Sequence, residues 1–184
     1  MLKLLLLDFD GTVADTRRAN TLAYIDALAE AGITLDEQTY TRNYFGMRCD
    51  EFLTKIGIDS PQQRLHIRKR KIELYPSHFD SVSLNKPLMA FTDNFRQHGG
   101  KAFIVSTGHI DNISNVIKHL KLEGRFDRII SGDDVSNPKP DPECFITAMN
   151  LANATPEQTL IFEDSDIGIE AARRSNAAVI RITL

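Results

Sequence analysis

The chain has 184 residues, of which 42% are hydrophobic and 26% are charged, a composition typical of one globular domain or of one domain with a modest insertion. Its 22 lysines and arginines against 25 aspartates and glutamates give a formal charge of −3, which favours neither nucleic acid nor an acidic membrane surface as a partner. The longest apolar run near the N-terminus, Leu4 to Leu7, is too short for a secretory or membrane-spanning segment.

The first predicted element is a buried strand over Lys3–Phe9, an apolar run that ends abruptly in Asp-Phe-Asp-Gly-Thr. Beyond it, residues 15–80 show helical spacing of apolar residues and no convincing strand. Asp15 or Thr16 can cap a first helix, and Ser60-Pro61 opens a long helix that runs to Tyr75. The sequence therefore predicts a helical insertion directly after the first strand.

From residue 86 onward, short apolar strands alternate with amphipathic helices. The expected strands are Lys101–Val105, Asp127–Ser131, Thr159–Glu163 and Ala178–Thr183. The helix between 86 and 99 carries Phe91 and Phe95, which we expect in the core. This alternation predicts an α/β fold, a Rossmann-like parallel sheet covered on both faces. We expect residues 1–14 and 81–184 to form this core and residues 15–80 to form an inserted helical cap domain.

Two carboxylates, Asp8 and Asp10, follow the first strand, and Gly11 beside them lets the backbone approach a ligand closely. Open parallel sheets bind ligands at the carboxyl ends of their strands. The pair suits a division of roles in which one carboxylate attacks a phosphorus centre and the other donates and accepts protons. An Asp-rich turn without function is an equally good explanation, so the interpretation depends on the other strand ends.

Those strand ends carry matching chemistry. Ser106 and Thr107 follow the second core strand and precede a helix, so a hydroxyl and helix amides can hold an oxyanion there. Lys139 lies between two prolines after the third strand and can supply a positive charge. Glu163 and Asp164 follow the fourth strand and offer the oxygen ligands that suit Mg²⁺. Each feature has an ordinary structural explanation alone, but four in this order favour a phosphoryl-transfer site.

Together, these segments resemble the four motifs of the haloacid dehalogenase superfamily, over nearly the whole chain. The segments are Leu7–Thr12, Ser106–Gly108, Lys139–Pro140 and Glu163–Ala172. The likeness is greatest to the branch that holds β-phosphoglucomutase, phosphoglycolate phosphatase and small sugar phosphatases, which place a helical cap after the first motif. The resemblance implies Mg²⁺ as cofactor and a small phosphorylated metabolite as partner, with no role for nucleic acid or a membrane.

The resemblance also implies roles for individual residues. Asp8 is expected to be the nucleophile that forms an aspartyl-phosphate, and Asp10 the general acid and base. The phosphate-binding residues implied are Gly11, Ser106, Thr107 and Lys139. The metal ligands implied are Asp8, the backbone carbonyl of Asp10, and Asp164, with Glu163 either a ligand or a partner of the ligands.

Three features of the predicted cap bear on specificity. Asn20 stands where the mutases and several sugar phosphatases of this branch carry histidine, which weakens a mutase interpretation because an amide cannot relay a proton in the same way. Gly46 and Arg48 lie in a loop that either faces the substrate or is an ordinary helix–helix turn. The basic stretch Arg64–Lys71 is expected to be a solvated helix face rather than a nucleic-acid patch.

The sequence thus predicts a Mg²⁺-dependent phosphomonoester hydrolase that acts through an aspartyl-phosphate on a sugar or polyol phosphate. A phosphomutase of the β-phosphoglucomutase type is the alternative, and a catalytically inactive binding domain of the same fold is less well supported. Cys49 and Cys144 have no metal-ligand spacing, so we expect free thiols and a cytoplasmic location.

Overall fold

The computed structural model describes residues 1–184 and contains a five-stranded parallel sheet with strand order β5-β4-β1-β6-β7. The strands are β1 (Leu4–Leu7), β4 (Lys101–Val105), β5 (Arg128–Ile130), β6 (Thr159–Glu163) and β7 (Ala178–Arg181). All five coincide with the predicted strands, and their ends differ by no more than one or two residues. The expected Rossmann-like α/β fold is confirmed.

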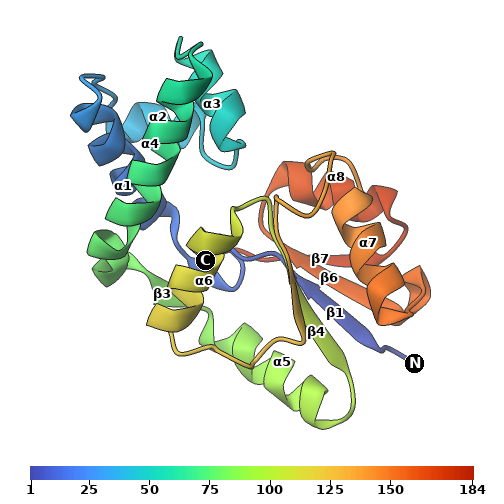
Figure 1. Ribbon diagram of the computed structural model, residues 1–184. Helices are drawn as coiled ribbons and strands as arrows, with labels where there is room; N and C mark the ends of the chain where they lie inside the picture. The colour runs from blue at the N-terminus through green and yellow to red at the C-terminus, as the bar shows by residue number, and fades with distance from the viewer.

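Both faces of the sheet are buried, which explains why β1 is a run of four leucines. Leu5 and Leu7 face one apolar cluster, and Leu4 and Leu6 face another. Two helices next to the sheet, α5 (Lys86–Gln97) and α6 (Ile110–His119), contribute to the first cluster, and α7 (Glu143–Ala152) and α8 (Asp166–Arg174) contribute to the second. The sheet therefore lies between two helical layers (Figure 1). This architecture gathers the carboxyl ends of the strands at one edge of the core.

The expectation that Phe91 lies in the core is wrong, because 47% of its surface is exposed. Helix α5 buries Leu88, Met89 and Thr92, so its buried face is rotated away from Phe91. The Phe91 ring keeps an edge contact with Phe162, with 5.8 Å between ring centres. Spacing located this amphipathic helix correctly but placed the centre of its buried face too far toward Phe91.

Residues 17–81 form a second group of helices, which lies to one side of the sheet (Figure 1). They are α1 (Arg17–Glu30), α2 (Glu37–Asn43), α3 (Cys49–Lys55), α4 (Pro61–Leu74) and a 3₁₀ helix over Tyr75–Ser81. Ser60 caps α4 by accepting from the Gln63 N–H, as its sequence predicts. Helix α2, which starts after the capping residue Asp36, was not among the predicted elements.

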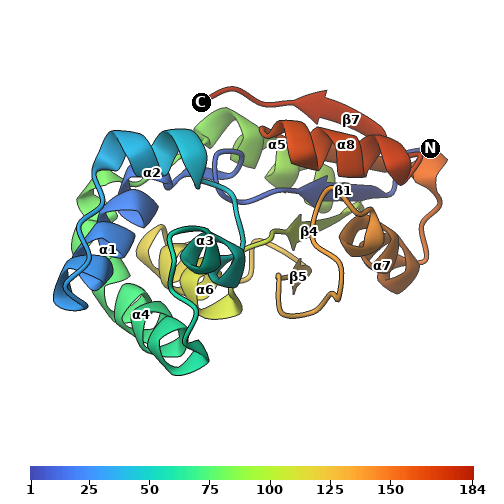
Figure 2. The ribbon, with the colours of Figure 1, turned by 90° about the horizontal axis from the view of Figure 1, so that it is seen from above.

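These helices have an apolar cluster of their own. Its buried members are Ala27, Leu28, Tyr40, Phe52, Leu53, Ile58 and Ile67. Helix α1 spans both parts of the molecule, since Ala19 and Ala23 belong to a cluster of the sheet while Ala27 and Leu28 belong to the helical cluster. Figure 2, seen from above, shows α1, α2 and α4 beyond the end of the sheet and α3 over α6. The first half of α1 thus packs against the core of the sheet, and its second half packs against the other helices of the segment.

Two very short strands lie where the chain leaves and re-enters the sheet region. They are β2 (Ala14–Asp15) and β3 (Ser83–Leu84), which pair antiparallel. Asn85 strengthens this junction: its backbone N–H donates to the Val13 carbonyl at 2.9 Å and its side chain to the Thr12 carbonyl at 3.0 Å. Strands of two residues carry no periodicity, so the sequence did not reveal them. The junction holds both connections of the helical segment side by side.

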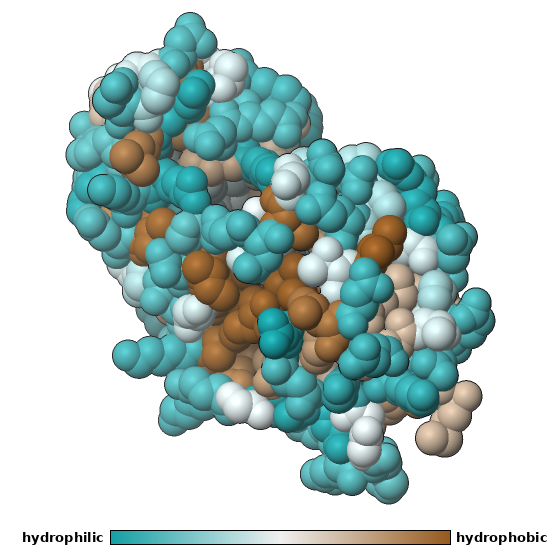
Figure 3. All heavy atoms as spheres, turned by 45° about the vertical axis from the view of Figure 1, so that its right-hand side comes forward, coloured by the Kyte–Doolittle hydropathy of each residue, from teal (hydrophilic) through white to brown (hydrophobic).

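The outer surface differs between the two regions. Polar side chains cover most of the helical region, whereas apolar side chains gather on one face of the sheet region (Figure 3). No helix is both long and apolar enough to cross a membrane.

Candidate active site

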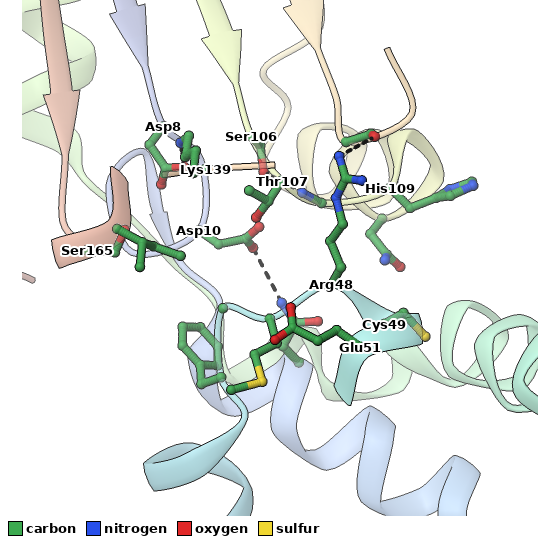
Figure 4. A pocket seen from close by; sticks show the side chains of 18 of the residues that line it. Asp8, Asp10, Arg48, Cys49, Glu51, Ser106, Thr107, His109, Lys139 and Ser165 are labelled. Carbon is green, nitrogen blue, oxygen red and sulfur yellow. Dashed lines mark hydrogen bonds and ion pairs between the residues drawn. The ribbon is translucent and has the colours of Figure 1, made fainter. Parts of the chain in front are cut away.

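The carboxyl ends of the strands open into a cavity of about 660 Å³, whose opposite wall is built by α1, α3, α4 and the loop before α3. Ten of the residues singled out from the sequence line it: Asp8, Asp10, Asn20, Gly46, Arg48, Ser106, Thr107, Lys139, Glu163 and Asp164. Figure 4 shows Asp8, Lys139 and Ser106 on the sheet side, while Arg48 extends from the helical side to the loop near Thr107. The fold thus brings together residues that lie far apart in the sequence.

Lys139 is the central contact of the sheet side. Its Nζ lies 2.8 Å from Asp8 Oδ1, 2.6 Å from Glu163 Oε1 and 3.1 Å from the Val105 carbonyl oxygen. Its side chain is only 2% exposed. Burial disfavours the charged form, but the carboxylates of Asp8 and Glu163 outweigh it and raise the pKa of Lys139. Lys139 is therefore a permanently charged ammonium group with a fixed position.

Glu163 is held from both sides. One oxygen accepts from Lys139, and Oε2 accepts from the backbone N–H and the hydroxyl of Ser165 at 2.8 and 2.9 Å. Gly168 lies so close that a Cβ there would meet Glu163 Oε1 at 1.8 Å. With both oxygens engaged, Glu163 is arranged to position Lys139. Of the two roles that the sequence left open, this geometry favours the partner of the ligands.

Asp8, Glu163 and Asp164 offer carboxylate oxygens that all lie within 4.8 Å of one another. Burial and the charge of Glu163 raise the pKa of Asp164 to about 6, and burial also raises the pKa of Asp8. The single ammonium of Lys139 leaves two negative charges of this cluster unneutralised. A divalent cation with a preference for oxygen ligands fits both the donor set and this charge.

Gly11 does not line the cavity, but its lack of a side chain leaves room for the Asp164 carboxylate. Its φ is +94°, and a Cβ at this position would lie 2.1 Å from Asp164 Oδ2. Only glycine therefore permits Asp164 to approach the turn that follows β1. The structure thus shows how Gly11 shapes this turn, and phosphate binding by Gly11 stays a prediction.

The carboxylate of Asp10 faces the helical segment. Its Oδ1 accepts a hydrogen bond from the hydroxyl of Thr16 and a long one, 3.5 Å, from the amide of Asn20. Burial raises the pKa of Asp10, although the bond from Thr16 acts in the opposite direction. A carboxyl group with a raised pKa can hold a proton nearer to neutral pH and donate it. On the sheet side, Ser106 and Thr107 line the cavity at the end of β4.

Lys71 is a cavity residue that the sequence analysis missed. The expectation of a solvated face for Arg64–Lys71 is wrong at this position, because Lys71 is only 2% exposed. Its Nζ lies 4.0 Å from the ring centre of Tyr75 and 5.1 Å from that of Tyr24. Burial lowers the pKa of Lys71 to about 8, against the opposing effect of Asp10. Its spacing of four from the buried Ile67 was the available signal.

Arg48 crosses from the helical side to the sheet side. Its guanidinium donates to the backbone carbonyls of Gly132 and Val135 at 3.3 Å and of Ser136 at 3.5 Å. The loop that presents it turns at Gly46, whose φ is +84°. A second contact between the two sides is the ion pair of Arg68 and Asp133, 3.4 Å apart. The predicted specificity loop therefore faces the cavity and is tied to the loop after β5.

The chain belongs to the haloacid dehalogenase-like hydrolase family, whose sequence model matches residues 5–182. Curated proteins that it resembles are phosphatases. One relative is the fructose-1-phosphate phosphatase YqaB of Escherichia coli, 26% identical over 98% of this chain and 96% of that protein. Another is a phosphoglycolate phosphatase of Aquifex aeolicus, 28% identical over 95% of this chain and 81% of that protein.

Solved structures share the fold over the whole chain. CbbY from Rhodobacter sphaeroides in complex with phosphate superposes with a TM-score of 0.91 at 21% identity, over 100% of this chain and 87% of that chain. A β-phosphoglucomutase from Clostridium difficile gives a TM-score of 0.86 at 22% identity, over 100% and 86% of the two chains. The expected family and fold are thus confirmed.

Proposed function

We propose that this protein is a Mg²⁺-dependent phosphomonoester hydrolase that acts through an aspartyl-phosphate on a small sugar or polyol phosphate. The observation that carries the proposal is the contact of Lys139 with Asp8 at 2.8 Å, within a cavity that also holds Asp10 and Ser106. Phosphoryl transfer requires mainly positioning and neutralisation of charge, and this set of residues supplies both.

In the first half of the reaction, Asp8 attacks the phosphorus atom of the ester. Lys139 holds one oxygen of Asp8, so the other is free to attack. As the bond between phosphorus and the ester oxygen breaks, Asp10 gives its proton to the departing alcohol, which its raised pKa favours. Lys139 and Ser106 stabilise the negative charge on the phosphoryl oxygens.

In the second half, Asp10 accepts a proton from water as the water oxygen attacks the phosphorus of the aspartyl-phosphate. The bond from phosphorus to Asp8 breaks, inorganic phosphate leaves and both carboxyl groups return to their starting states. A buried carboxyl near the phosphoryl group can serve as both acid and base, because it loses a proton in the first half of the reaction and regains one in the second.

The proposed cation would be held by Asp8, Asp164 and the backbone carbonyl of Asp10. Bound there, Mg²⁺ neutralises charge on the cluster and on the phosphoryl group. The support is the two uncompensated charges of the buried cluster and the pKa of Asp164, raised to about 6 by burial and Glu163. Glu163 is assigned to Lys139 and not to the metal.

We further propose that residues 15–80 act as a cap over the core formed by 1–14 and 81–184. The support is the separate apolar cluster of the helical segment and the short β2–β3 junction at its two ends. Such a cap can exclude water from the phosphoryl group and read the rest of the substrate. Within it, Asn20, Gly46 and Arg48 line the cavity and are proposed specificity residues.

The hydrolase is favoured over a phosphomutase by the relatives and by Asn20. The relatives at 26% and 28% identity are phosphatases, whereas the mutase in the comparison, at 22% identity, shows the shared fold alone. Asn20 places an amide 3.5 Å from Asp10, and an amide is not a proton relay. The mutase alternative predicts isomerisation of a sugar phosphate that needs a bisphosphate primer.

The test is phosphate release from a panel of phosphorylated metabolites, with and without Mg²⁺. We expect release from sugar or polyol phosphates, complete loss with Asp8→Asn, and a loss of about 10²–10⁴-fold with Asp10→Asn, the range for lost proton transfer. Asp59→Asn, an exposed aspartate outside the cavity lining, is the control. Phosphate release that survives Asp8→Asn, or isomerisation without net release, contradicts the proposal.

A further inference from the structure

Asp164 differs from the other carboxylates of the proposed metal cluster in how it is held. Asp8 accepts from Lys139, and both oxygens of Glu163 are engaged by hydrogen bonds. The carboxylate of Asp164, by contrast, has no hydrogen-bond donor and no ion-pair partner in another residue. It still belongs to the group whose oxygens all lie within 4.8 Å of one another. The position of this carboxylate therefore depends on the backbone that carries it.

The backbone of Asp164 is held by Arg181, the last residue of β7. Strands β6 and β7 are neighbours in the sheet, and Arg181 lies opposite Glu163 in their register (Figure 1). Its Nη1 donates to the Asp164 carbonyl at 2.9 Å, and its Nη2 donates to Asp166 Oδ1 at 2.6 Å. The guanidinium thus joins the residue that follows β6 to the first residue of α8.

The peptide group that follows Asp164 is anchored at both ends. Its N–H, which belongs to Ser165, donates to Glu163 Oε2 at 2.8 Å. Its carbonyl oxygen accepts from Arg181 and from no other donor in the protein. A peptide plane held at both ends resists rotation, and that rotation would turn the Asp164 side chain with it. Without Arg181, only the bond to Glu163 would remain.

The contacts of Arg181 do not act mainly as a surface ion pair that stabilises the fold. The side chains of Arg181 and Asp166 are 48% and 94% exposed, and ion pairs at such sites contribute little to stability. The charge of Arg181 also has the wrong sign to attract a cation. As a charge alone, Arg181 would weaken the binding of a cation to the carboxylates, whereas as an anchor of Asp164 it would strengthen it. The two roles therefore predict changes of opposite sign when the guanidinium is removed.

We propose that Arg181 is a positioning residue for Asp164. By holding the Asp164 carbonyl, it keeps the carboxylate in place for a divalent cation shared with Asp8. Arg181 does not line the cavity and lies outside the four motifs. The inference rests on the cation site of the proposed function and adds to it a residue that acts from β7. Partners that orient a metal ligand typically change the affinity for the metal by about 10–100-fold.

The test measures the dissociation constant of Mg²⁺ by isothermal titration calorimetry on metal-free protein, for wild type, Arg181→Met and Arg173→Met. Methionine keeps an apolar stem and removes both the donors and the charge. Arg173→Met removes a like charge from an exposed position of α8 outside the cavity lining. Thermal unfolding without Mg²⁺ verifies that each variant folds, and Arg181→Ala replaces Arg181→Met if that variant does not fold.

We expect Arg181→Met to weaken the binding of Mg²⁺ by about tenfold or more, although a positive charge has been removed. Its thermal midpoint without Mg²⁺ should stay close to that of wild type. In phosphate release, this variant should need more Mg²⁺ for half-maximal activity, while its kcat at saturating Mg²⁺ should be nearly that of wild type. Arg173→Met should bind Mg²⁺ as wild type does.

The outcomes separate this inference from the proposed function. If wild type binds no Mg²⁺, the cation site of the proposed function fails, and the role of Arg181 fails with it. If wild type binds Mg²⁺ and Arg181→Met binds it equally or more tightly, the role of Arg181 alone is overturned. Equal weakening by Arg173→Met also overturns this role, because the effect would then not depend on the contact with Asp164.

Discussion

The hydroxyl of Thr16 donates to the carboxylate of Asp10, although Thr16 stands at the N-cap position of α1. An N-cap side chain ordinarily accepts from an N–H of its own helix, and Thr16 makes no such bond. The hydroxyl of the residue that starts α1 therefore binds the proposed general acid, Asp10, instead of its own helix. Any displacement of α1 that breaks this contact also changes the environment of Asp10.

Thr16→Val tests this link through the pH dependence of kcat/KM. The hydrogen bond from Thr16 stabilises ionised Asp10 and so lowers its pKa, while burial raises it. Without the hydroxyl, this bond no longer counteracts the effect of burial, so the pKa of Asp10 should rise further. Because Asp10 must be protonated in the first half of the reaction, the alkaline limb of the profile should move to higher pH. Thr21→Val, which removes a buried hydroxyl bonded to the Arg17 carbonyl in the same helix, is the control and should leave the limb in place.

The metal proposal predicts a pH-dependent affinity for Mg²⁺. Burial and Glu163 raise the pKa of Asp164 to about 6, so protons compete with the cation as the pH falls through this value. The concentration of Mg²⁺ needed for half-maximal activity should therefore increase below about pH 6. Added Mg²⁺ should also raise the thermal midpoint at pH 7.5, since only the folded chain assembles the cluster.

Asp164→Asn should abolish that rise in the midpoint, whereas Asp166→Asn should retain it. Asp166 is a neighbouring carboxylate, but it is exposed and pairs with Arg181. Activity and a midpoint that are both insensitive to chelator and to Mg²⁺ would rule out the cation site.

The sheet could be predicted because its strands are apolar on both faces, and a run such as Leu4–Leu7 has few alternatives in an α/β chain. The end of the sheet that carries the candidate site could be predicted because three of the four motifs lie directly at the end of a strand. The contact of Lys139 with Asp8 could not be derived from spacing, since 131 positions separate the two residues. Only the order of the strands in the sheet, together with the family resemblance, brings them together.

The helical segment, the proposed cap, was harder to predict for a physical reason. Polar residues there have specific partners that no local pattern reveals. Asp15 or Thr16 was expected to cap the first helix; Thr16 stands at the N-cap position, but its hydroxyl binds Asp10. Lys71 was expected in solvent and instead lies buried over Tyr75. Arg48 was expected either to face the substrate or to lie in an ordinary helix–helix turn, and its terminal nitrogens donate to backbone carbonyls of the facing loop. Each of these partners depends on how the helical segment meets the core.

Lys71→Met should separate stability from activity. Burial lowers the pKa of Lys71 from 10.5 to about 8, so its charge destabilises the folded state. Methionine removes that cost, and the free energy of unfolding at pH 7 should rise by up to about 3 kcal/mol. The gain in stability over wild type should be largest below pH 8, where Lys71 is protonated in both the folded and the unfolded state. It should decline between about pH 8 and 10.5, where the folded state holds Lys71 neutral and no longer bears the cost of its buried charge.

Activity of the same variant should fall, because the positive charge of Lys71, which helps to stabilise ionised Asp10, is lost. Lys69→Met, an exposed lysine on the same helix, should change neither property. Urea unfolding at several pH values and kinetics on one substrate provide both measurements. A Lys71→Met variant that is less stable than wild type at pH 7 contradicts the assignment of a buried, destabilising charge.

The last prediction distinguishes recognition of the substrate body from recognition of its phosphoryl group. Arg48 lines the cavity and binds the Gly132 and Val135 carbonyls of the facing loop, so we expect it to act when a real substrate holds the proposed cap closed. Arg48→Ala should therefore lower kcat/KM for sugar phosphates by roughly tenfold or more and change the ranking among them. It should have little effect on p-nitrophenyl phosphate, which barely reaches the cap.

Lys139→Ala should instead depress every substrate by a similar factor, because all share the phosphoryl group that Lys139 neutralises. Its loss also leaves Asp8 and Glu163 without their buried counter-charge, so the variant needs a parallel thermal unfolding measurement. Arg42→Ala, an exposed arginine of the cap that lies outside the cavity lining, is the control for Arg48→Ala. If Arg48→Ala scales all substrates by one factor, or changes none, the loop at Gly46 is a surface turn and specificity resides elsewhere in the cap.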